Sequence, residues 1–230
     1  MKYLKWFKLS FLILILVYYK TESVHAQDVV PLQNGNLDDF ITKAKCSKWS
    51  IVKKDKNKGV NISTRWLYFG DTIKTREMAL YFRVNAGIKD VISNLRSTSA
   101  LKTWNLGIRE LNLIDKSDST WITHTVYDIP YPFSQQDLVT KSTIIEHVSN
   151  TIINVNAVPY IIKQTDNIQR QQSYHGRWIL QTNSNGMTEV HFSAISFTET
   201  NIPRFIRDPI VQNKLLKSFI KLKELSTTKP

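Results

Sequence analysis

The sequence predicts an α+β fold, in which one long, curved antiparallel sheet of about nine strands wraps around a long C-terminal helix. Two observations support this prediction. Residues 49–84 and 107–197 contain many short stretches rich in Ile, Val, Thr, Trp and Tyr, which is typical of half-buried strands. The chain then closes with a long helical pattern over residues 203–225. Because one face of the sheet must be covered, we expect this helix to lie across it.

The first elements are expected to be a short helix and an antiparallel meander. Asn36 or Asp38 can cap a helix that ends near Ala44. Three strands follow, separated by turn-forming residues such as those of 55–59. In the third strand every second residue is apolar, which indicates one buried face. The three predicted strands are 49–54, 60–69 and 76–84.

The period changes at residue 88. Ile88, Val91, Ile92 and Leu95 follow the spacing of an amphipathic helix, and a further helical turn is expected over 99–103. Short polar breaks then separate six more strands, and breaks of this length join neighbouring strands as hairpins. The six predicted strands are 107–115, 120–127, 137–147, 151–158, 171–182 and 187–197.

The closing helix is predicted to present one apolar arc to the sheet. Asp208 followed by Pro209 resembles an N-cap and first helical position, which predicts an opening turn and then a long helix from residue 209. Asn213 interrupts the apolar arc, and a buried amide needs a hydrogen-bond partner. A ligand, trapped water or backbone group could supply it. The predicted arc consists of Pro209, Asn213, Leu216, Phe219 and Ile220.

Length and composition indicate one folded domain. The chain has 230 residues, of which 42% are hydrophobic and 11% aromatic, so it can bury enough apolar surface to fold. The single cysteine, Cys46, cannot form an internal disulfide, and no Cys/His cluster has the spacing of a zinc site. We therefore expect no disulfide and no structural metal, and we also expect a monomer without cofactor. The net charge of +12 favours anionic partners.

The first 26 residues have the pattern of a secretory signal. Lysines precede an apolar run of eleven residues, 9–19, and small residues flank a cleavage position after Ala26. The run is shorter than the roughly 20 residues that a membrane span requires. We therefore predict a signal peptide over 1–26, one domain over 27–230, and a secreted or periplasmic protein. That location makes nucleic acid the least expected anionic partner.

Catalytic motifs are missing from the sequence. It contains no Gly-x-Ser-x-Gly elbow, His-Glu-x-x-His pair, phosphate loop or dinucleotide glycine motif. Glu110, Glu146 and His147 could meet as acid and base, but their spacing does not require it. We therefore do not predict an enzyme.

Several residues are expected to face the closing helix. Trp178 and Phe192 lie on the most apolar strand faces, together with neighbours at every second position. His124 shares a strand face with Ile122 and Val126, which predicts that it points inward, either as a core histidine or as a polar contact for a ligand.

Four stretches resemble the StAR-related lipid-transfer (START) domain, a helix-grip fold of the Bet v 1-like superfamily. Residues 128–139 are similar to the family's Pro-x-Pro and Arg-Asp stretch, and three later stretches match its closing pattern in order and spacing. The likeness covers 38–225. Gln136 departs from the family's arginine beside Asp137, which puts in doubt an ion pair at that strand edge. The three later stretches are 176–180, 186–190 and 202–203.

The resemblance implies a protein that encloses one hydrophobic molecule, such as a sterol, phospholipid or fatty acid, between sheet and helix. START domains are carriers or sensors, whereas the wider superfamily includes cyclases and hydrolases, so an enzyme using His124 or Glu146 in the same cavity is the alternative. A basic stripe on the last helix could rest on an anionic membrane or be a solvated face; it consists of Arg207, Lys214, Lys217 and Lys221. The candidate ligand-binding residues are Phe82, His124, Val126, Trp178, Phe192, Asn213, Leu216 and Ile220.

Overall fold

The computed structural model describes residues 36–131, 133–197 and 203–227. The chain divides into two compact units, 1–31 and 32–230, and all described residues belong to the second. The predicted signal peptide over 1–26 lies outside the described residues.

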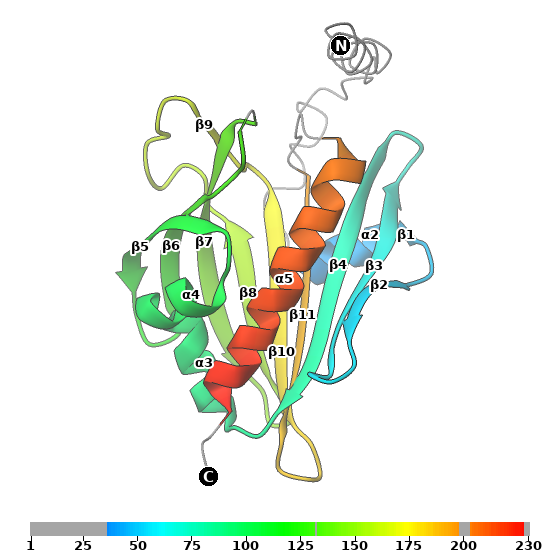
Figure 1. The fold of residues 1–230 in the computed structure, drawn as a ribbon, viewed down its shortest axis with the longest axis vertical. Coiled ribbons are helices and arrows are strands. Elements are labelled where there is room, and N and C mark those ends of the chain that lie inside the picture. Colours follow the sequence, from blue (N-terminus) through cyan, green and yellow to red (C-terminus); the bar gives the residue numbers. More distant parts are fainter. Residues whose placement is uncertain (1–35, 132, 198–202, 228–230) are drawn as a thin grey trace, which may run out of the picture. The chain divides into compact units, whose positions relative to one another are not determined.

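The second unit is built on one sheet, which contains eleven strands among the described residues (Figure 1). Neighbours along the sheet follow the order β1-β3-β4-β11-β10-β8-β7-β6-β5, with β2 added on β3 and β9 on β7. All pairs are antiparallel except β7 with β9. The strands are β1 (Lys45–Cys46), β2 (Ser50–Asp55), β3 (Val60–Phe69), β4 (Ile73–Val84), β5 (Ile108–Lys116), β6 (Thr120–Tyr127), β7 (Gln135–Glu146), β8 (Thr151–Ala157), β9 (Ile168–Arg170), β10 (Tyr174–Thr182) and β11 (Thr188–Ser196).

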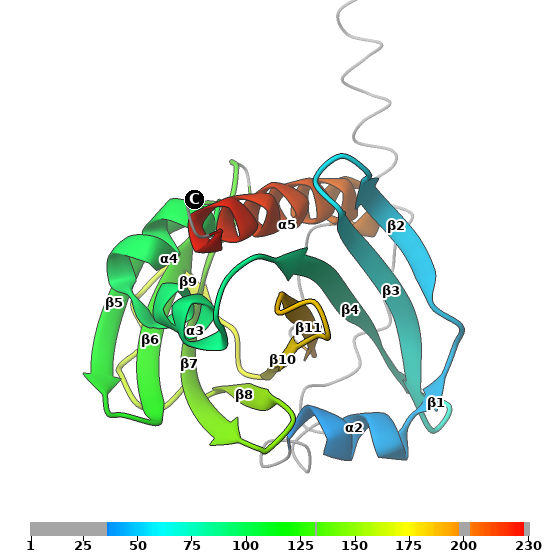
Figure 2. The same cartoon turned by 90° about the horizontal axis from the view of Figure 1, so that it is seen from below.

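Four helices lie in the described part of the unit. They are α2 (Leu37–Lys43), α3 (Ile88–Arg96), α4 (Thr98–Trp104) and α5 (Arg204–Ser226). Figure 2 shows α5 on one side of the sheet and α2 on the other. We call the side under α5 the inner face and the side that carries α2 the outer face. The predicted α+β arrangement, a curved antiparallel sheet around a long terminal helix, is confirmed.

Local sequence explains the ends of α2 and α5. The Asn36 side chain accepts a hydrogen bond from the Asp39 amide while the Asp39 carboxylate accepts one from the Asn36 amide, a reciprocal cap that fixes the first turn of α2. In α5 the expected break at Asp208 is wrong. The helix begins after Pro203 and continues through Pro209. Pro209 lies beyond the first turn, so it removes one amide bond from the helix without ending it.

Aromatic rings fill the space between the second half of α5 and the inner face. The Phe219 ring stacks on Trp178 with centroids 5.4 Å apart, and Trp104 from α4 meets both rings edge-on at 6.1 and 6.2 Å. Phe82 and Leu222 are fully buried in the same cluster. Burial of this much apolar surface supplies the main stabilisation of the fold.

The inner face beneath the C-terminal helix

Strand pairing arranges inner-face residues in rows that cross the sheet. Leu80, Phe192, Trp178 and Ile153 are cross-strand partners in one row, which Phe219 covers. The next row toward the beginning of α5 has smaller side chains, and we call it the small-residue row. It consists of Met78, Ala194, Gly176, Val155 and Ser142.

The two halves of α5 contact the inner face differently. Its buried residues are Ser218, Phe219, Leu222 and Ser226, all in the second half. In the first half Phe205 is 70% exposed, and Ile206 and Ile210 are also exposed. Met78, Ala194 and Val155 of the small-residue row are only half-buried. The first half of α5 therefore leaves part of an apolar sheet face uncovered.

Polar contacts hold the beginning of α5 at the edge of the sheet. Asp208 forms an ion pair with Arg76 of β4 at 2.7 Å, and the Arg204 guanidinium lies 4.6 Å from the centre of the Trp66 ring. Further along α5, the ammonium group of Lys214 donates to the backbone carbonyl of Asp128 at 3.0 Å. These contacts fix the helix position without filling the inner face.

Two tyrosines bring hydroxyl groups to this region. Tyr174 lies two residues before Gly176 on β10, and its hydroxyl is 3.0 Å from the position that a Cβ at Gly176 would occupy. Burial raises the pKa of Tyr127 to about 12, and burial together with Tyr127 raises the pKa of Tyr174. Both phenols are therefore neutral hydrogen-bonding groups at physiological pH.

Buried hydroxyls also line the neighbouring strands. The side chains of Thr123 and Thr140 bond each other at 3.1 Å, and Ser142 is 4% exposed. These residues share the inner face with Trp121, because side chains two positions apart on a strand point the same way. The region is thus mainly apolar with a few hydroxyl groups.

The structure brings five of the eight candidate residues to the inner side. Phe82 and Trp178 are buried in the aromatic core, and Phe192, Leu216 and Ile220 are half-buried against it. Phe82 and Trp178 pack directly against Phe219, so their main contacts are within the protein.

The expectation that His124 and Val126 point inward is wrong. They share a strand face as predicted, but it is the outer face. Trp121 of the same strand belongs to the inner core, and the strand pairs with β7 without a bulge. His124 lies three residues after Trp121, an odd number, so its side chain points to the opposite face. The His124 ring bonds the Asp137 carboxylate at 2.8 Å. Both faces of β6 carry buried residues, so the alternation alone could not tell which face meets α5.

The outer face also supplies the cation that Gln136 lacks. Arg170 of β9 donates to both carboxylate oxygens of Asp137 at 2.7 Å, and the two side chains are only 1% and 0% exposed. Arg170 also donates to the carbonyls of Pro159 and Ile162. The ion pair that Gln136 put in doubt is present at this edge, because an arginine 33 residues beyond Asp137 takes the place of the neighbour.

The expected burial of Asn213 is wrong as well. Asn213 is exposed, because the buried arc of α5 is centred on Phe219 and Leu222 and is rotated away from it. Lys217 and Lys221 of the predicted basic stripe are exposed, whereas Arg207 and Lys214 are partly covered.

The residues considered for acid–base chemistry lie apart. Glu110, Glu146 and His147 are exposed on β5 and at the end of β7, while His124 lies on the outer face. Among the described residues no group of His, Cys, Asp and Glu side chains is arranged to hold a metal ion. None of the helices in the described part of the chain has the length and apolar character needed to cross a membrane.

Comparisons with known proteins place this geometry in a fold class. No family model matches the sequence. Among solved structures, a STAR-related lipid transfer protein from Xanthomonas axonopodis is similar with a TM-score of 0.67 and 21% identity, covering 77% of this chain and 98% of that one. Human STARD10 has a TM-score of 0.63 at 12% identity, covering 84% and 80%. The chain therefore has the START-like helix-grip fold that the sequence resemblance implied.

One further sequence relative and one further solved structure are similar to this chain. The uncharacterized protein PA1579 of Pseudomonas aeruginosa is 22% identical over 138 residues, which cover 56% of this chain and 68% of the relative. Human StAR-related lipid transfer protein 5 is similar in structure, with a TM-score of 0.61 at 11% identity, covering 87% of this chain and 92% of that one.

Sequence reasoning missed the residues that define the uncovered region. Met78, Val155 and Tyr127 were not among the candidates, although period-two alternation places Met78 on the same face as Phe82. The sequence alone does not mark small residues such as Ala194 as ligand-binding candidates, because they matter only where the covering helix leaves the sheet surface uncovered.

Proposed function

We propose that this protein binds one largely apolar molecule between the first half of α5 and the inner face of the sheet. The observation that carries the proposal is that Met78, Ala194 and Val155 of the small-residue row are only half-buried, beneath a helix half that has no buried side chain. Removing apolar ligand surface from water there is worth about 25 cal/mol for each Å² buried. The START-like fold and the lipid-transfer proteins that share it support the same kind of ligand.

The ligand is expected to carry at least one hydrogen-bonding group. Tyr127 and Tyr174 offer neutral hydroxyls close to an otherwise apolar surface. Such a group fixes the orientation of an apolar molecule in a binding site. Sterols, fatty acids and phospholipids all satisfy this description.

The test is native mass spectrometry of the protein expressed from its full sequence and recovered from the secreted or periplasmic fraction. We expect a one-to-one complex with an apolar compound that organic extraction releases. If residues 1–26 are a signal, the intact mass should equal that of a chain whose first residue is Gln27. Repeated recovery of an empty protein that takes up no sterol, fatty acid or phospholipid would exclude the carrier function.

A matched pair of variants tests the location. Ala194 and Ser193 are neighbours on β11 whose side chains point to the inner and outer faces. Ala194→Leu should occupy the small-residue row and reduce lipid loading, whereas Ser193→Leu should leave it unchanged. Equal loading of both variants would place the ligand elsewhere. If Ala194→Leu does not fold, Tyr174→Phe tests the same region by removing one hydroxyl.

A further inference from the structure

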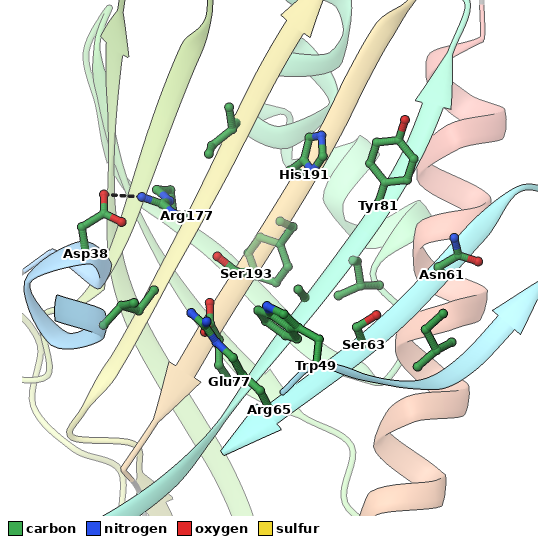
Figure 3. Close-up of a pocket in the computed structure, with 16 residues that line it drawn as sticks. Asp38, Trp49, Asn61, Ser63, Arg65, Glu77, Tyr81, Arg177, His191 and Ser193 are labelled. Atoms are coloured by element: carbon green, nitrogen blue, oxygen red, sulfur yellow. Dashed lines mark hydrogen bonds and ion pairs between the residues drawn. The ribbon is translucent and has the colours of Figure 1, made fainter. Parts of the chain in front are cut away.

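A groove of about 500 Å³ lies on the outer face of the sheet, away from the proposed lipid site (Figure 3). Its floor is formed by the outer-facing residues of β3, β4, β11 and β10. Asp38 and Ile41 of α2 border one side, and Trp49 and Ile51, at the start of β2, border the other.

The pattern of side-chain sizes creates this hollow. Ser63, Ala79 and Ser193 are cross-strand neighbours in the middle of the floor, where short side chains leave space. Larger side chains surround them, including Tyr81 and Trp49. Trp49 is 44% exposed, so one aromatic wall of the groove is open to solvent.

The charges in the groove are already paired. Arg65 donates to the Glu77 carboxylate at 2.6 Å, and Glu77 is almost fully buried. Arg177 forms an ion pair with Asp38. Two arginines and two carboxylates therefore neutralise each other, and the site offers no excess charge of either sign from these four groups.

Two buried polar atoms of the groove have no hydrogen-bond partner. They are the Nε of Arg177, a donor, and the Oδ1 of Asn61, an acceptor. Figure 3 shows Arg177 beside α2 and Asn61 on the opposite side of the groove. Buried polar atoms are normally satisfied. Both atoms are closed off from solvent, so a bound molecule that carries an acceptor and a donor would meet them once the two side chains turn toward the groove.

We propose that the outer groove binds an uncharged, polyhydroxylated molecule of the sugar class. Hydroxyl groups donate and accept at once, which matches Asn61 and Arg177. The C–H groups of a sugar ring carry partial positive charge and pack on the negative faces of aromatic rings, which Trp49 and Tyr81 provide. The guanidinium of Arg65 lies 4.6 Å from the centre of the Trp49 ring and holds the indole in place at the groove wall.

This site is independent of the lipid site. The sheet separates the two, since Ser193 and Ala194 alternate along β11. A sugar in the outer groove and an apolar molecule under α5 would thus contact opposite faces of the same strands.

Nuclear magnetic resonance titration with cellobiose and N,N′-diacetylchitobiose tests the proposal, with sodium acetate as a charged comparison. We expect at least one disaccharide to give saturating shifts of the Ser193 and Ala79 amides and the Trp49 indole. Shifts confined to the inner face, no saturation by either sugar up to about 20 mM, or stronger binding of acetate would overturn the proposal.

Variants separate this site from the lipid site. Trp49→Ala removes an exposed aromatic wall and should weaken sugar binding about fivefold or more, and Ser193→Phe should abolish it. Lipid loading should be unchanged in both, whereas Ala194→Leu should reduce lipid loading and leave sugar binding intact. Unchanged sugar affinity in Trp49→Ala would contradict the proposed site even if Ser193→Phe fails to fold.

Discussion

The buried ion pair of Asp137 and Arg170 has a structural role that an exposed pair does not have. Arg170 joins Asp137 on β7 to backbone carbonyls of the segment that follows β8. Arg170→Ala leaves a buried carboxylate without its cation, and we expect it to lower the free energy of unfolding by about 3–5 kcal/mol. Urea unfolding measures this change.

The control for this variant is Arg83→Ala. Arg83 pairs with Glu189 at 2.8 Å, but its side chain is 58% exposed, and exposed pairs contribute little to stability. A similar, small effect of both substitutions would show that Arg170 does not stabilise the fold as proposed here.

The buried phenol of Tyr127 predicts a loss of stability in alkali. Burial raises its pKa to about 12 in the folded protein, whereas an unfolded tyrosine titrates near pH 10. The folded state therefore binds more protons between these values, so its stability is complete below about pH 10 and falls as pH rises, by up to about 1.4 kcal/mol per pH unit. Unfolding at several alkaline pH values should show a shallower decline in Tyr127→Phe, and an identical decline would refute the assignment.

At the scale of elements, α5 is expected to open from its beginning. The Arg76–Asp208 ion pair, whose side chains keep 19% and 17% of their surface exposed, joins the first half of α5 to β4, while Phe219 anchors the second half. Asp208→Asn removes about 1 kcal/mol or less of attraction. We expect up to about fivefold faster amide hydrogen exchange in 204–213 and no change in 218–226.

Phe219→Ala gives the contrasting result for the same helix. It removes a ring that packs on Trp178, Trp104 and Phe82, at a cost of about 3–5 kcal/mol. Hydrogen exchange should then accelerate throughout the sheet and α5. Exchange that rises uniformly in both variants would mean that α5 moves as one unit with the core.

From the exposed apolar side chains in the first half of α5 we also expect contact with a membrane surface. Phe205, Ile206 and Ile210 are exposed, and Lys217 and Lys221 lie further along the same helix. We expect vesicles that contain phosphatidylglycerol to bind the protein more strongly than phosphatidylcholine vesicles, with about 1 kcal/mol from each lysine near the surface. Vesicle sedimentation measures this binding. It should be weaker for Phe205→Ser than for the parent protein, and added salt should weaken the binding of the parent protein. Binding that is independent of salt and of Phe205 would exclude this surface.

At the scale of the whole molecule, the fold leaves part of an apolar sheet face uncovered, which is where we propose that a ligand binds. A ligand that binds only the folded state adds about 2.7 kcal/mol of stability at one hundred times its Kd. If the protein carries a lipid as proposed, we expect its extraction to lower the melting temperature and its return to restore it. Ala194→Leu, which fills part of the small-residue row itself, should respond less to lipid. A melting temperature that is independent of lipid would argue against a cavity ligand.

The sequence by itself determined the elements and their order. Stretches rich in β-branched and aromatic residues between turn residues predicted nine of the strands, and helical spacing predicted the terminal helix, because these local patterns follow from backbone geometry. It missed β1 and β9, since strands of two and three residues are too short to show a period. The pairing of β9 with β7 brings Arg170 to Asp137, a contact that only the tertiary structure reveals.

Only the tertiary structure decided which face of each strand meets α5 and how far α5 covers it. The sequence grouped His124 with Val126 correctly but could not assign their face, because both faces of β6 carry buried residues. It could not predict the exposure of Asn213 either, since the rotation of α5 is set by how Phe219 fits among Trp104 and Trp178. Residue patterns report that a surface is buried, whereas packing between distant segments determines what buries it and what space is left.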